Sequence, residues 1–141
     1  MNPKMSLKVR LFLLLSGCFI FFAWGFRLYV LTIRWGTDPF RVWTISFALI
    51  YLIIGLFLIW LGMLGSRVSK KKYTWLIYVA IFLIVYWAFR LTNLLLYPDL
   101  DPNPRAHLHL SVTFMVIGAL LFVIGWTGIK KDKLTELAPL G

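Results

Sequence analysis

Two arginines inside apolar stretches are the side chains of this chain best placed to do chemistry. Arg27 and Arg90 lie 63 residues apart, and each precedes the end of a long apolar stretch by about six residues, or ~9 Å along a helix. A charge at mid-membrane depth costs ~2.5–3.5 kcal/mol, and less where an arginine can extend toward the interface. A matched pair of such arginines predicts a bound anionic group.

Several anionic partners fit these arginines. Asp38 and Asp101, again 63 residues apart, lie just beyond the apolar stretches, so an Arg–Asp clamp closing each helical hairpin is the structural interpretation. A lipid phosphate, a salt bridge to another subunit, or a transported anion or carboxylate are the functional alternatives. Asn93, one turn beyond Arg90 on the same helix face, adds a polar group to this candidate site.

Two histidines begin the last apolar stretch. His107 and His109 are two positions apart, so on a helix they project about 200° apart and cannot jointly hold one ion. We expect interfacial hydrogen bonds from them. The functional alternative is that one of them contacts a pigment, quinone or haem held by a neighbouring chain, because no intrinsic cofactor or metal site is expected.

Catalytic constellations are absent from the sequence. No Asp or Glu lies within an apolar stretch, although proton pumps and cation antiporters normally need one. The chain also lacks HExxH, CxxC, a glycine-rich phosphate loop and a nucleophile–base pair. We therefore expect a protein that is not an enzyme.

Composition and length of the apolar stretches set the fold class. The chain has 141 residues, of which 61% are hydrophobic and 14% charged. Its four apolar stretches, about 9–33, 42–64, 73–97 and 108–129, each exceed the ~20 residues that a helix needs to cross a membrane. Backbone groups in lipid must be satisfied internally, which favours helices. We expect an all-α integral membrane protein with four transmembrane helices in a single membrane domain, 1–141.

The offset of 63 residues holds over both halves of the chain without a gap. The residues of the first half that recur at this offset include Trp24, Phe26, Arg27, Leu28, Leu31, Asp38, Pro39, Ile54, Gly55, Leu58, Gly62 and Gly65. The pattern predicts an internal duplication, with repeats of about 9–65 and 72–128. Because spans one and three run in the same direction, the repeats are two tandem helical hairpins of parallel topology.

Basic residues predict the orientation. Ten of the 15 lysines and arginines lie at the N-terminus, between spans two and three, and at the C-terminus, which is one side of a four-span protein. This positive-inside pattern places both termini in the cytoplasm. Composition suggests a bacterial inner membrane. The basic clusters then meet phospholipid headgroups, and nucleic acid is not an expected partner.

Small residues recur every seven positions on the second helix of each repeat. They are Ala48, Gly55, Gly62, Ser111, Gly118 and Gly125. Such a stripe lets helices approach closely in lipid, so we expect helix packing, either between spans two and four or within each hairpin. The alternative is a groove for a flat hydrophobic ligand.

These patterns favour a non-catalytic accessory or structural subunit of a larger membrane complex, which packs through its helices and binds lipid. Other membrane subunits are then its main partners. Two alternatives remain open: a small homo-oligomeric transporter or lipid- or anion-handling protein that uses Arg27 and Arg90, and a subunit that contacts a neighbour's cofactor.

Overall fold

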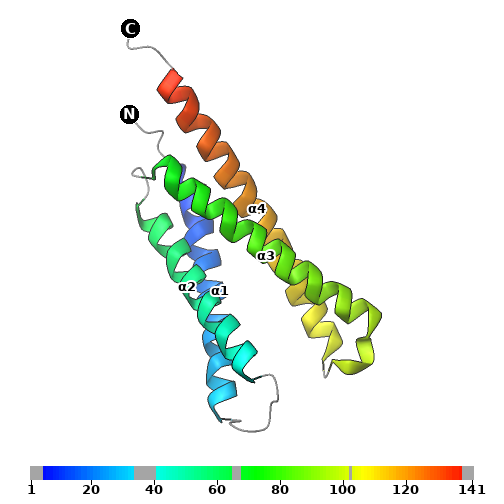
Figure 1. Ribbon diagram of the computed structural model, residues 1–141. Coiled ribbons are helices and arrows are strands. Elements are labelled where there is room, and N and C mark those ends of the chain that lie inside the picture. The colour runs from blue at the N-terminus through cyan, green and yellow to red at the C-terminus, as the bar shows by residue number, and fades with distance from the viewer. Residues whose placement is uncertain (1–4, 34–40, 65–67, 102, 138–141) are drawn as a thin grey trace. The chain divides into compact units, whose positions relative to one another are not determined.

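The computed structural model describes residues 5–33, 41–64, 68–101 and 103–137, without the side chains of Arg41, Asp132, Thr135 and Glu136. Within these residues the chain is helical (Figure 1). The elements are α1 (Leu7–Ile33), α2 (Arg41–Leu64), α3 (Lys70–Leu96), the short 3₁₀ helix η2 (Pro98–Leu100) and α4 (Pro104–Leu137). Asp38 and Gly65, both singled out in the sequence, lie outside the described residues.

Four of these helices are long and apolar enough to cross a membrane. They coincide with the four predicted spans to within a few residues, except that α4 is longer at both ends. The prediction of an all-helical chain with four such helices is confirmed, and this is consistent with a helical membrane protein.

The extra length of α4 has a local cause at each end. Pro104 is its first residue, where the missing N–H of proline costs nothing. At the other end, lysines and leucines without an intervening proline continue the helix to Leu137. With 34 residues, α4 extends about 50 Å and exceeds the ~30 Å hydrocarbon core.

The chain divides into two compact units, Lys4–Val68 and Ser69–Gly141 together with Met1–Pro3. In the first unit α1 packs against α2, and in the second α3 packs against α4. The division falls in the connection between the two predicted repeats.

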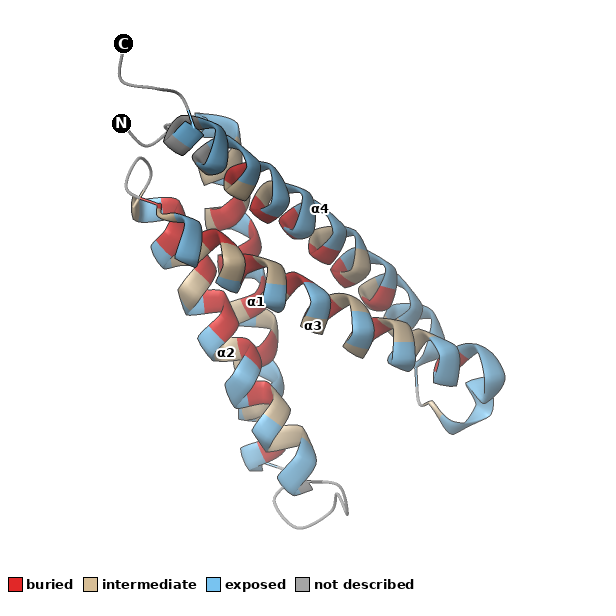
Figure 2. Cartoon of the chain, turned by 45° about the horizontal axis from the view of Figure 1, so that its top comes forward, coloured by how far each residue is buried: buried red, intermediate tan, exposed pale blue. Residues whose placement is uncertain are grey.

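Each helix buries one stripe of side chains (Figure 2). In the first unit the fully buried side chains include Leu13, Ile20, Ala48, Tyr51 and Leu58. In the second they include Leu76, Leu83, Ser111, Phe114 and Leu121. These ten residues are five pairs separated by 63 positions, so the buried stripe has the same register in both units.

Glycines bring the helices of each unit into close contact. A methyl group placed on Gly55 would lie 2.9 Å from the backbone oxygen of Gly17, and one placed on Gly118 would lie 2.8 Å from Ile84 Cγ1. Further along each helix, Gly62 and Gly125 meet the facing helix at similarly short distances. At these glycines the neighbouring helix of the same unit fills the space that a side chain would occupy.

Candidate functional site

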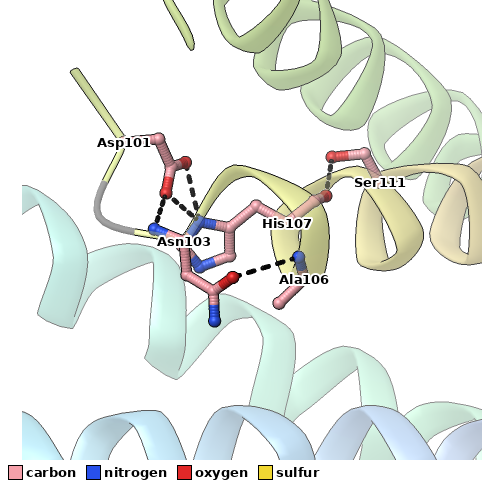
Figure 3. A network of polar contacts seen from close by, with 5 residues as sticks. All are labelled: Asp101, Asn103, Ala106, His107 and Ser111. Carbon is pink, nitrogen blue, oxygen red and sulfur yellow. Dashed lines mark hydrogen bonds and ion pairs between the residues drawn. The ribbon is translucent and has the colours of Figure 1, made fainter. Parts of the chain in front are cut away.

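A cluster of polar side chains lies at the connection between α3 and α4 (Figure 3). Its centre is the carboxylate of Asp101, which follows η2 and has 17% of its side chain exposed. The backbone N–H of Asn103 donates to Asp101 Oδ1 at 2.8 Å, which is the local turn that aspartate favours. The Asp101 carboxylate is thereby turned toward the first helical turn of α4.

His107 is the second partner of this carboxylate. Its Nδ1 lies 2.6 Å from Oδ1 and 2.7 Å from Oδ2 of Asp101. Because an ionised carboxylate can only accept hydrogen bonds, Nδ1 carries the proton, and in the neutral ring Nε2 is the acceptor. The contact fixes both the tautomer and the orientation of the imidazole, 26% of which is exposed.

The start of α4 holds the histidine in place. Asn103 is the N-cap, and its Oδ1 accepts a hydrogen bond from the backbone N–H of Ala106 at 3.4 Å. The hydroxyl of Ser111 donates to the carbonyl oxygen of His107 at 2.7 Å. His107 therefore sits on the capped, hydrogen-bonded first turns of the helix.

The pKa of Asp101 is lowered from the ordinary aspartate value. Partial burial is the largest single influence and would raise this pKa, but the combined opposing effects outweigh it. These are the hydrogen bonds from Asn103 and His107 and the positive charges of His107 and Arg90. Asp101 is accordingly an ionised acceptor near neutral pH.

Arg90 acts on this cluster through its charge. It is exposed on α3, and the close partners of Asp101 are His107 and Asn103. Within the part of the chain that the structure describes, no hydrogen bond or ion pair joins Arg90 to Asp101. The structure thus brings Asp101 together with His107, while the guanidinium of Arg90 stays available to a group outside the cluster.

The other predicted site residues are placed as follows. Arg27 is exposed on α1, and its predicted partner Asp38 lies outside the described residues. Asn93 is exposed on α3, one turn from Arg90. His109 is exposed on α4, away from the contact that His107 makes. Among the described residues no three His, Cys, Asp or Glu side chains form a group that could hold a metal ion.

Sequence reasoning missed two contacts. Arg10, counted there only as part of a basic cluster, donates from Nε to the carbonyl oxygen of Gly62 at 3.1 Å, where α2 approaches its end and carbonyls lack helical partners. The Asp101–His107 pair was also missed. The Asp-Pro-Asn-Pro pattern at 101–104 is typical of a turn followed by a helix cap, and this could have suggested that Asp101 faces the first turn of α4.

Comparison of the chain with protein-family models, curated proteins and solved structures finds no match. The class of protein therefore follows from the fold alone, and four apolar helices suggest a membrane protein.

Proposed function

We propose that this protein is a non-catalytic accessory subunit of a larger membrane complex, which packs through its helices and binds lipid. The observation that carries the proposal is the exposure of two arginines to the surroundings of the chain. Arg27 and Arg90 are both exposed, at matching positions, on helices that otherwise expose large apolar side chains. A charge at that depth is costly unless an anionic group from outside the chain compensates it.

The surroundings of the arginines support an external partner. Phe26 and Phe89, the residues that precede them, are 68% and 67% exposed. Within an apolar 18-residue window of each candidate span only 22–39% of the residues are buried inside the structure. Lipid or other membrane helices must cover the remainder, because these side chains cannot face water at such density.

Co-purification tests the proposal. The tagged chain is extracted from its native membrane in mild detergent, and we expect it to elute with larger membrane subunits. The variants Phe26→Ala and Phe89→Ala should weaken this association without changing the melting temperature of the isolated chain. A chain that elutes alone contradicts the accessory role. A homo-oligomer instead supports the transporter alternative, and a coloured fraction supports contact with a cofactor.

The same proposal includes an origin by duplication, with the two units as tandem hairpins of parallel topology. Its support is the recurrence of contacts at the offset of 63 residues. Trp24 stacks on Tyr51 and Trp87 stacks on Phe114, and both members of each pair shift by 63. An experimental structure in lipid should superpose residues 9–65 on 72–128 by a rotation of about 180° about the membrane normal. A different packing of the second unit would contradict the duplication.

The orientation belongs to the proposal as well, with both termini in the cytoplasm of a bacterial cell. It rests on the basic residues that flank the helices. Lys71 is exposed near the start of α3. In a Cys18→Ser background, the variant Lys71→Cys should be protected from an impermeant thiol reagent applied outside intact cells. Labelling of Lys71→Cys in intact cells would contradict the proposed orientation and place the termini outside the cytoplasm.

A further inference from the structure

We propose that α3 carries a binding site for the phosphate group of an anionic lipid, formed by Arg90, Asn93 and Tyr97. The inference rests on the lipid-binding part of the proposed function and names the ligand class and the residues. It is independent of which subunits the protein contacts. The lipid lies in the leaflet that surrounds the α3–α4 connection.

The three side chains lie on one face of the helix. Positions 90, 93 and 97 are separated by three and four residues, so they project within about 60° of one another. Tyr97 is the C-cap residue that follows α3. Its backbone N–H still donates to the carbonyl oxygen of Asn93 at 2.9 Å, which keeps Tyr97 on the last turn although its own backbone angles leave the helix. All three residues are exposed, Tyr97 to 59%.

The donors match a phosphate diester. The arginine fork donates two parallel hydrogen bonds to phosphate oxygens, the Asn93 amide supplies a further N–H, and the Tyr97 hydroxyl another donor. Tyr97 ends the helix, where tyrosine prefers the membrane interface. Arg90 lies about two helical turns before Tyr97. Its long side chain extends from there toward the level of the Tyr97 hydroxyl.

The local acids do not occupy this guanidinium. Asp101, the acid on which the charge of Arg90 acts, accepts hydrogen bonds from His107 and Asn103 with both of its oxygens. Asp99 is exposed on η2, and no ion pair joins it to Arg90 among the described residues. The guanidinium of Arg90 therefore makes no hydrogen bond or ion pair with these two acids and can bind an anion from outside the chain, and in a membrane phosphate headgroups are the nearest such groups.

The first unit offers a matched control. Its corresponding arginine is Arg27, but Asn93 is replaced there by Val30. Arg27 thus has the charge without the neighbouring amide donor. The two arginines lie at corresponding positions of their helices, so a difference in lipid binding between them reports the Arg90 site itself rather than a general attraction to positive charge.

Native mass spectrometry of the purified full chain in detergent tests the site, with phosphatidylglycerol as the probe. We expect Arg90→Leu to weaken phosphatidylglycerol binding about tenfold and Asn93→Val about threefold, because each removes hydrogen bonds to a charged group. Arg27→Leu should change it by less than about twofold, since Val30 replaces the amide donor of Asn93 beside that arginine. Arg90→Lys should fall between, because it keeps the charge and loses the fork.

Three outcomes would overturn the proposal. Arg90→Leu could bind phosphatidylglycerol as the unmodified chain does, or Arg27→Leu could weaken binding as much as Arg90→Leu. Inorganic phosphate could displace the lipid at millimolar concentration, which would make the site one for a free anion. Circular dichroism checks that each variant is folded. If Arg90→Leu does not fold, the lipid affinities of Asn93→Val and Arg90→Lys test the site instead. None of these results depends on partner subunits, so they are separable from a failure to co-purify.

Discussion

The two helix pairs keep the same aromatic contact while changing the residues around it. In the first pair the rings of Trp24 and Tyr51 stack with centroids 4.2 Å apart and planes 3° apart. In the second, Trp87 and Phe114 stack at 4.5 Å and 12°. The tryptophan is the same and its partner differs only by a hydroxyl group. What is retained between the pairs is the flat aromatic contact across the seam.

The backbone approach differs more. In the first pair two glycines face each other, because a methyl group on Gly17 would lie 2.8 Å from the Gly55 oxygen. In the second pair the residue that corresponds to Gly17 is Ala80. A methyl group on Gly118 would lie 3.3 Å from the backbone oxygen of Ala80, a longer distance than in the first pair. The second pair is therefore less tightly apposed at this point, and side chains take the place of backbone contact.

The pairs differ again at the end opposite the predicted arginine sites. Arg10 hydrogen-bonds the Gly62 carbonyl in the first pair. Its counterpart at the offset is Tyr73, whose ring lies directly over Gly128 and leaves no space for a side chain there. Arg10 and Tyr73 are corresponding residues with different contacts, a charged hydrogen bond in one pair and an aromatic–glycine contact in the other. The two pairs thus share spacing and small residues more closely than they share individual polar contacts.

The largest expected effect is the loss of either ring stack. Trp24→Ala and Trp87→Ala should each lower the free energy of unfolding by about 3 kcal/mol, because each leaves a cavity in the seam. Titration of the purified chain with SDS, followed by circular dichroism, measures this. Trp43→Ala is the control, since Trp43 is 69% exposed, and Tyr51→Phe should cost less than about 1 kcal/mol because the stack remains. If one tryptophan behaves like Trp43, the two stacks are not equivalent.

Alanine substitutions at the corresponding glycines, Gly55 and Gly118, should destabilise the two helix pairs by different amounts. Gly55→Ala should destabilise by about 2 kcal/mol, because the new methyl group meets backbone atoms of Gly17 and Phe21 that cannot yield easily. Gly118→Ala should cost about half as much, since its shortest contact is with the Ile84 side chain, which can change rotamer. The same SDS titration measures both variants. Equal costs would mean that the second pair is as tightly apposed as the first.

A smaller effect is expected at the first pair alone. Arg10→Met should cost about 1 kcal/mol, because it removes the hydrogen bond to the Gly62 carbonyl and keeps most of the apolar stem. Lys8→Met is the control, as Lys8 is exposed and its variant removes a neighbouring positive charge. Melting temperature in detergent reports the difference. If the two variants have the same melting temperature, the hydrogen bond of Arg10 contributes nothing to stability beyond the effect of its charge.

The smallest effect is the pH dependence of the second pair. Because the folded-state pKa of Asp101 is lowered, its ionised form stabilises the fold above the ordinary aspartate pKa of about 3.9. This contribution is lost as the pH falls through the lower folded-state value. Asp101→Asn should therefore flatten the decline of melting temperature between about pH 5 and pH 3. An unchanged slope would show that the Asp101–His107 pair does not contribute to stability.

In the sequence the predicted repeat is marked by identical residues and by the stripe of small residues, in which Ser111 corresponds to Ala48. The correspondence between Tyr51 and Phe114 does not appear among the identical residues, because an identity match cannot recognise that two different aromatic rings make the same packing contact. The buried stripe, in contrast, was anticipated at its glycines, since small residues at seven-residue spacing face one direction on a helix. The partner of Asp101 could not be deduced, because Arg90 and His107 are both near it in sequence and are both cations when protonated.

The sequence by itself determined the number of long apolar helices, their approximate bounds and the positions of the arginines within them. These follow from local properties, since apolar length and the need to satisfy backbone groups act segment by segment. Only the tertiary structure decided that Asp101 faces His107, that Arg10 meets the Gly62 carbonyl and that tryptophans stack across each seam. Such pairings depend on distances of a few ångströms between side chains of neighbouring elements, and those distances exist only after the helices have packed.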